Sequence, residues 1–192
     1  MINPFYEPFP DAVTICGRVC PVVTDFRDWL RFADLLSDDS VPAQILPVLA
    51  GNWFLCPPAV LTRAHFHALL DFYQAKALRP EREPENMPES APHKPPVFDW
   101  KLDAPFLIAD FRQFYQTDLL HISFLHWWEF LTLFRGLPQK SQSKERIYYR
   151  GCDLNQIHDR HERERILKIR RTIALPFSMS DEDIGAAMAD FL

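Results

Sequence analysis

The chain has 192 residues, 47% of them apolar, and a formal net charge of −5. This length supports one domain with its own hydrophobic core, and the negative charge gives no overall attraction to nucleic acid or to an anionic membrane. Five glycines against 17 prolines argue against a sheet protein built on many tight glycine turns, so a mainly α fold is predicted.

The sequence carries no recognisable targeting or membrane signal. No apolar run approaches the roughly 18 residues that a membrane span needs, and the first residues lack the basic and then apolar pattern of a signal peptide. We therefore expect a cytoplasmic protein, and we expect its four cysteines to be reduced.

An extended arm and a β-hairpin are predicted at the start of the chain. Residues 1–11 are rich in proline and aromatic side chains, which favours an extended surface arm. In residues 12–23, β-branched residues lie on both sides of Gly17-Arg18. Strand-forming residues around a two-residue turn are typical of a hairpin, so we expect a short hairpin with Gly17-Arg18 in its turn.

Two helices are predicted next. Thr24 or Asp25 can cap the first, whose apolar residues recur at helical spacing as far as Leu36. The second is a weaker helix over residues 41–50, because Pro47 is expected to kink or break it.

A third helix and a long insertion follow. Residues 59–78 again show apolar residues at helical spacing. Residues 79–96 hold six prolines among charged and polar residues, and this composition cannot bury enough apolar surface to offset the entropy lost on ordering. We expect a mobile or extended loop. Because long loops add little closure entropy, we place it inside a single helical domain over residues 12–176.

The segment 118–138 predicts the central helix, and a fourth helix capped by Asp103 with Pro105 in its first turn leads into it. Ser123 can cap the central helix and Gly136 can end it. Its bulky apolar residues recur at helical spacing: Phe124, Trp127, Trp128, Leu131 and Phe134.

Two polar residues, His126 and Glu129, lie next to the adjacent tryptophans. Each indole N–H needs a hydrogen-bond partner, so His126 and Glu129 are interpreted as structural neighbours rather than as an acid–base pair. The pattern leaves open whether the aromatic cluster is core or an exposed groove.

Helical signals continue to the C-terminus. Ser143 can start a short helix, and Asp159 can start a longer one that ends near Ala174. Residues 144–171 form the basic segment of an otherwise acidic chain. Residues 177–192 carry a capping box and a short amphipathic stripe, which predicts a C-terminal helical tail.

Candidate metal sites have simpler explanations. Cys16 and Cys20 could join other cysteines or a histidine around zinc, but their spacing is not the two-residue knuckle of specific zinc motifs, so buried reduced cysteine is favoured. His158 and His161 lie at i and i+3, which within a charged run is typical of a solvated helix face. No metal and no cofactor are expected.

The sequence also lacks the motifs of common enzymes. It contains no nucleophile elbow, no phosphate-binding glycine loop and no HExxH motif, so we do not expect an enzyme. The basic segment could contact a nucleic-acid backbone. However, acidic residues interleave with it and offer helical ion pairs to Arg163 and Lys168, which is typical of a solvent face and makes nucleic acid a less favoured partner.

Several motifs resemble the bacteriophage family named after gene product fifteen, which is found in the tail-gene region of siphophages and prophages. The most specific is His126-Trp127-Trp128-x-Phe130 with Gly136-Leu137. The others, in chain order, are GRVCPVVTDFRDWLRF from Gly17, Phe98-Asp99, Asp103, FRQFYQTDL from Phe111, and the run from Arg150 to Pro176 with Asp153, Ile157, Asp159, Lys168 and Ala174-Leu-Pro. The sequence departs from the family pattern in the proline-rich insertion, in the extension after Pro176 and at Gln116, where the pattern tends to have glycine.

The resemblance implies a non-enzymatic tail morphogenesis protein, namely a tail assembly chaperone that binds the tape-measure protein. Tail-tube subunits and a second copy of the chain are further candidate partners, and no membrane is implied. Such a chaperone needs exposed apolar grooves. The candidate partner-binding residues are Trp127, Trp128, Phe134, Ile184, Met188 and Phe191. The alternative is a head–tail connector or nucleic-acid-associated protein that uses residues 144–171.

Overall fold

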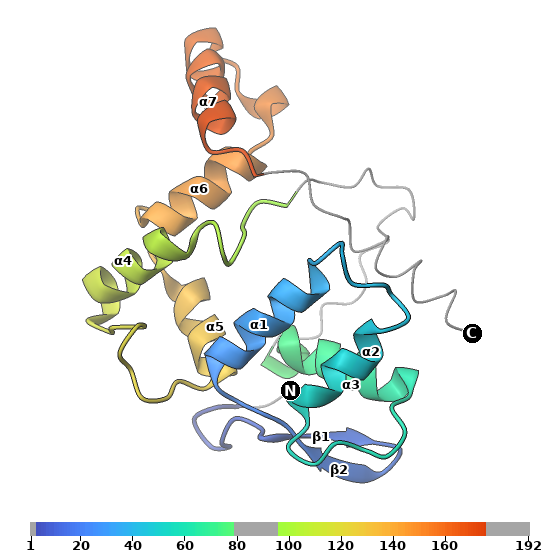
Figure 1. Ribbon diagram of the computed structural model, residues 1–192. Helices are drawn as coiled ribbons and strands as arrows, with labels where there is room; N and C mark the ends of the chain where they lie inside the picture. Colours follow the sequence, from blue (N-terminus) through green and yellow to red (C-terminus); the bar gives the residue numbers. More distant parts are fainter. Residues whose placement is uncertain (1–2, 79–95, 176–192) are drawn as a thin grey trace. The chain divides into compact units, whose positions relative to one another are not determined.

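The computed structural model describes residues 3–78 and 96–175 (Figure 1). Within these ranges the secondary structure consists of helices α1 to α7, three short 3₁₀ turns and one antiparallel hairpin, so the predicted mainly α fold is confirmed. The predicted tail 177–192 and almost all of the predicted proline-rich loop lie outside the described residues.

The chain forms two compact units, and the described residues of each come from two separate stretches of sequence. Among the described residues, unit 1 contains 3–78 and 124–135, and unit 2 contains 96–123 and 136–175. The proposed division into an arm, one domain over 12–176 and a tail stays a prediction.

The hairpin of unit 1 consists of β1 (Ala12–Ile15) and β2 (Arg18–Pro21). Cys16 and Gly17 form its turn, with φ of 49° and 77°. The predicted hairpin is therefore confirmed, but its turn lies one residue earlier than Gly17-Arg18. The reason is that a two-residue turn of this kind needs a positive φ at both central residues, while Arg18 already pairs with Ile15.

Helices α1 and α2 follow the hairpin. α1 (Phe26–Leu36) begins where the sequence predicts, because the Asp25 carboxylate accepts the Arg27 N–H at 2.9 Å. α2 spans only Leu46–Ala50, and Pro47 lies in its first turn. The predicted helix over 41–50 is therefore shortened, and Pro47 is tolerated at its start because a proline in the first turn removes only an N–H that has no helical partner.

Helix α3 (Arg63–Tyr73) is shorter than the predicted 59–78. Thr62 begins it, with the His65 ring nitrogen Nδ1 at 2.7 Å from the Thr62 hydroxyl. Ala75, with φ of 49°, takes the chain out of the helical conformation soon after its end.

Helix α5 (Trp127–Gly136) ends at the predicted glycine but begins four residues after the predicted cap, Ser123. The reason is that the residues before it pair with the chain entering α1. Phe26 N–H donates to Leu125 O at 2.9 Å, and Trp127 N–H donates to Thr24 O at 2.8 Å. This short antiparallel bridge places the starts of α1 and α5 together in unit 1.

Unit 2 contains α4 (Ala104–Tyr115), α6 (Gln142–Gly151) and α7 (Arg160–Thr172). Asp159 caps α7 as predicted, accepting backbone N–H groups at 2.7 and 3.1 Å. Ser141, rather than the predicted Ser143, caps α6. Each cap satisfies N–H groups that have no partner within their own helix.

The end of α4 gives a test of backbone strain. Gln116 terminates this helix in the left-handed conformation, with φ of 53°. A residue with a Cβ pays about 1 kcal/mol there, whereas glycine does not. We therefore expect Gln116→Gly to raise the free energy of unfolding by about 0.5–1 kcal/mol in urea denaturation.

The matched control is Gln113→Gly, which makes the same change at an exposed position inside α4 and is expected to cost roughly 1 kcal/mol. Loss of stability in both variants would contradict the assignment of strain to Gln116.

Candidate functional site

The two adjacent tryptophans of α5 are core residues. Trp127 is 0% exposed and Trp128 is 3% exposed. This answers the question that the sequence left open, and it corrects the hypothesis that these two indoles offer a partner an exposed surface. Phe134 is half-buried, and Ile184, Met188 and Phe191 lie outside the described residues. The role of these four residues in partner binding stays a prediction.

The indole N–H groups explain why the tryptophans are buried. The last carbonyls of a helix have no N–H partner within that helix. At the end of α3, Trp128 Nε1 donates to Phe72 O at 2.9 Å, and Trp127 Nε1 donates to Tyr73 O at 2.8 Å. Side chains of α5 therefore cap the C-terminus of α3, more than 50 residues earlier in the chain.

Aromatic rings fill the space around these hydrogen bonds. The Trp127 ring stacks on the rings of Tyr73 and Phe130, with centroid distances of 5.4 and 5.5 Å. Trp29 of α1 stacks on Phe72 of α3 at 4.7 Å. Such pairs contribute about 0.5–1.5 kcal/mol each beyond the area they bury, so helices α1, α3 and α5 share one aromatic core.

His126 precedes α5 and has both ring nitrogens occupied. Nδ1 accepts the Trp128 backbone N–H at 3.0 Å, so Nε2 carries the proton and donates to Pro10 O at 3.1 Å. Burial lowers the pKa of His126, while the charges of Glu129 and Asp11 oppose this shift. His126 is thus a structural neighbour of Trp128, as predicted, but the two indole N–H groups donate to carbonyls of α3 rather than to His126 or to the exposed Glu129.

The arm before β1 is attached at this histidine. Phe9 stacks on the His126 ring at 5.2 Å and meets Trp128 edge-on at 6.4 Å. Farther towards the N-terminus, Phe5 and Tyr6 are 92% and 85% exposed. The arm is thus fixed at one end and carries two exposed aromatic rings at the other.

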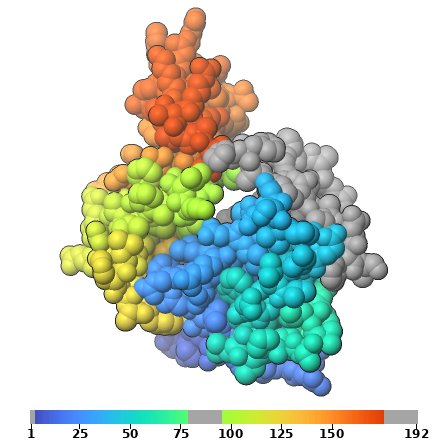
Figure 2. Space-filling model, viewed as in Figure 1, coloured from blue at the N-terminus to red at the C-terminus, as the bar shows by residue number. Residues whose placement is uncertain are grey.

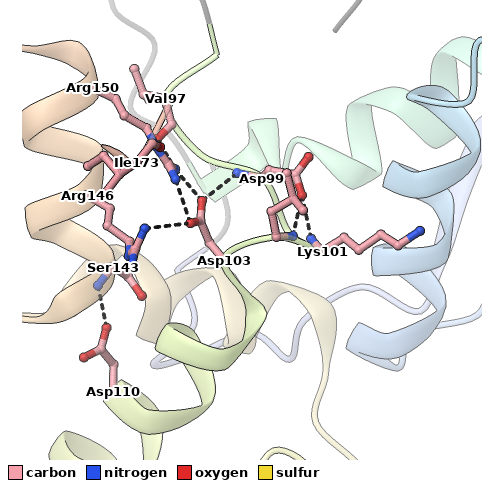
Figure 3. Close-up of polar contacts among 10 residues, drawn as sticks. Val97, Asp99, Lys101, Asp103, Asp110, Ser143, Arg146, Arg150 and Ile173 are labelled. Carbon is pink, nitrogen blue, oxygen red and sulfur yellow. Dashed lines mark hydrogen bonds and ion pairs between the residues drawn. The ribbon is translucent and has the colours of Figure 1, made fainter. Parts of the chain in front are cut away.

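Unit 2 is held together by a buried ion pair that the sequence analysis missed (Figure 3). Asp103 is 1% exposed, and Arg150 Nη2 donates to its carboxylate at 2.9 Å. The same guanidinium donates to Val97 O at 3.2 Å and to Ile173 O at 2.7 Å. Arg150 therefore joins the segment before α4 to the end of α7.

This pairing also explains a wrong prediction about Asp103. The residue does precede α4, but its carboxylate makes no hydrogen bond to the first turn of that helix. It accepts the Asp99 N–H at 3.1 Å instead, and Arg150 holds its two oxygens. A bidentate Arg–carboxylate pair is stronger than a neutral cap bond, so it determines where this side chain lies.

A second buried carboxylate, Asp110 of α4, binds the start of α6 (Figure 3). It accepts the N–H groups of Gln142 and Ser143 at 3.0 and 2.8 Å. The start of a helix favours negative charge, so this contact stabilises α6 and packs it against α4. The predicted start at Ser143 is corrected by this arrangement, because Ser143 already lies inside the first turn.

Helix α7 forms the orange-red atoms in Figure 2, and its exposed side chains include Arg160 and Arg165. Arg160 pairs with Glu164 at 3.0 Å and Arg165 pairs with Glu162 at 2.9 Å. The predicted helical ion pairs are therefore present, but they are formed by Arg160 and Arg165 rather than by Arg163 and Lys168. The Arg163 guanidinium donates to the Ile157 carbonyl instead.

The cysteines differ from their predicted burial. Cys16 and Cys56 are exposed, Cys20 and Cys152 are partly exposed, and none is in a disulfide. The described ranges contain no group of three or more His, Cys, Asp or Glu side chains arranged to hold a metal ion. Nor is any helix within those ranges long and apolar enough to cross a membrane.

Comparison with known proteins identifies one family. A family model described as Bacteriophage Gp15 protein matches residues 5–175, which include residues 5–11 of the arm, the aromatic core of unit 1 and the buried ion pair of unit 2. The resemblance noted from the sequence motifs is thereby confirmed. No curated protein and no solved structure matches the chain.

The capping of α3 by α5 can be tested with Trp128→Phe. This change keeps most of the apolar bulk but removes the indole donor to the Phe72 carbonyl, which keeps only the Ala75 N–H at 3.0 Å; the loss of one such hydrogen bond costs about 0.5–1.5 kcal/mol. We expect the free energy of unfolding to fall by that amount in urea denaturation. As a control, Tyr148→Phe removes a polar group from a side chain that is 54% exposed and is expected to change it by less than about 0.5 kcal/mol.

The buried ion pair calls for a double-mutant cycle. Asp103→Leu leaves the Arg150 guanidinium buried without its partner and is expected to cost about 3–5 kcal/mol. Adding Arg150→Met removes that uncompensated charge, so the double variant should be more stable than Asp103→Leu alone. Arg160→Ala is the control, since this arginine is 88% exposed and its pair contributes little. Additive losses at 103 and 150 would show that the two side chains do not interact.

His126 predicts a dependence of stability on pH. Because its folded-state pKa lies below the unfolded value, it contributes stability above about pH 6.5, and this contribution is lost as the pH falls through the folded-state pKa. We expect the stability difference between wild type and His126→Asn to shrink between about pH 7.5 and about pH 5. A difference that stays constant over this range would mean that protonation of His126 does not oppose folding.

Proposed function

This chain belongs to the bacteriophage Gp15 protein family, and we propose that it is a tail assembly chaperone, a non-enzymatic protein that binds the tape-measure protein in the cytoplasm of the bacterial host. The tape-measure protein is long, helical and prone to aggregate, so a chaperone for it must offer apolar contacts. Tail-tube subunits and a second copy of this chain are further partners under this proposal.

The observation that supports this proposal is the amount of large apolar surface left open in unit 1. Large exposed apolar surface on a soluble protein often marks a binding site. In unit 1 the exposed large apolar residues come from the arm, the hairpin, α2, and the segments before α3 and α5: Phe5, Tyr6, Val19, Ile45, Val48, Leu55, Val60 and Phe124.

A second candidate function, a head–tail connector or nucleic-acid-associated protein, is favoured by the basic segment 144–171. Lys168 and Arg171 are exposed on α7. Against this candidate, glutamates on the same helix pair with two of its arginines, which lowers the local positive charge.

Salt dependence separates the two candidates. Contacts to phosphates weaken steeply as salt rises, whereas apolar contacts weaken little. We expect coexpression with the tape-measure protein encoded nearby to give a complex that coelutes on size exclusion at low and at high salt and that keeps the tape measure soluble. Recovery of the chain without the tape measure but with DNA that dissociates at high salt would favour the second candidate.

A further inference from the structure

We infer that Phe5 and Tyr6 are the aromatic anchors of the partner-binding surface. This inference rests on the proposed function, and it replaces the buried Trp127 and Trp128 as the contact residues. With exposed fractions of 92% and 85%, the two rings are the most exposed of the large apolar side chains in the part of the chain that the structure describes. Complete burial of such a ring contributes about 1.5–3 kcal/mol, which makes adjacent aromatic residues effective anchors.

The backbone presents the two rings in a defined turn. Asn3 Oδ1 accepts the Phe5 N–H at 3.1 Å, and Asn3 O accepts the N–H groups of Tyr6 and Glu7 at 3.0 and 2.9 Å. An asparagine side chain that bonds the backbone two residues on stabilises such a turn. The two rings therefore extend from a hydrogen-bonded turn rather than from an irregular segment without backbone hydrogen bonds.

The arm is fixed to the aromatic core at its other end. Phe9 stacks on His126 at 5.2 Å, and the ring of His126 hydrogen-bonds Pro10 O at 3.1 Å. Only Pro8 separates Glu7, the last residue of this turn, from Phe9. Because part of the arm is already ordered, binding through Phe5 and Tyr6 loses less conformational entropy than binding through a free peptide.

Charge indicates the chemistry of the partner. The stretch from Asn3 to Gly17 contains the acidic residues Glu7 and Asp11 and no lysine or arginine. An apolar groove bordered by basic side chains on a helical partner complements this arm, with the rings in the groove and Glu7 at its rim. Under the proposed function this partner is the tape-measure protein.

The test uses the full chain with the double change Phe5→Ser and Tyr6→Ser, coexpressed and purified with the tape-measure protein. Because both side chains are exposed, we expect the variant to fold, which circular dichroism and tryptophan fluorescence check. The expected result is binding weakened by at least about tenfold, which corresponds to about 1.4 kcal/mol. Glu7→Lys is expected to weaken binding less, by a factor that decreases as salt rises.

The matched control is Leu120→Ser with Tyr148→Ser, which removes two large apolar side chains that are 59% and 54% exposed in unit 2. This control should bind as the wild type does. A photo-crosslinking amino acid at position 5 gives an independent readout, since it should crosslink to the tape measure.

Each outcome decides between the inference and the function on which it rests. If the wild type binds the tape measure and the arm variant binds equally well without a crosslink from position 5, the inference is wrong and the proposed function stands. If the wild type forms no complex, both fail. If the arm variant changes only the self-association of the free chain, the rings bind a second copy and the inference is overturned in its choice of partner.

Discussion

Unit 1 depends on the hydrogen bonds that side chains of α5 make to the end of α3. A helix end leaves carbonyls that must find donors, and here the donors are two indole N–H groups from the other stretch of chain that builds the unit. Each of these hydrogen bonds contributes about 0.5–1.5 kcal/mol, and keeping both restricts how far α5 can move along α3. The stacked rings then fill the surrounding space, because each indole brings its large apolar surface to the same place.

The same requirement explains why the tryptophans are not a contact surface. An indole that donates to a buried carbonyl cannot also turn towards a partner, so the family's most specific motif serves the core. His126 links this core to the arm, because one ring nitrogen accepts the α5 backbone N–H while the other donates to Pro10 O. Under the proposed function, apolar contact with a partner comes from Phe5 and Tyr6, which stay exposed next to this attachment.

Unit 2 has an apolar core that includes Phe111 and Ile166, and it adds buried charges to that core. Arg150 and Asp103 are both removed from water, and the guanidinium also satisfies two backbone carbonyls from distant parts of the unit. The buried Asp110 carboxylate accepts two backbone N–H groups at the start of α6. Buried charges of this kind are costly unless every bonding group has a partner, so they specify one arrangement of α4, α6 and α7 more strictly than apolar contacts would.

The sequence by itself determined the elements whose signals are local. The mainly α class, the hairpin, the caps at Asp25 and Asp159 and the end of α5 at Gly136 depend on hydrogen bonds and backbone conformations within a few residues, and these are confirmed. Only the tertiary structure decided that Trp127 and Trp128 are core, that α5 begins after a bridge to the chain entering α1, and that Asp103 pairs with Arg150 instead of capping α4. In each of these cases the deciding partner lies tens of residues away, and spacing along the chain carries no information about which distant donor meets which acceptor.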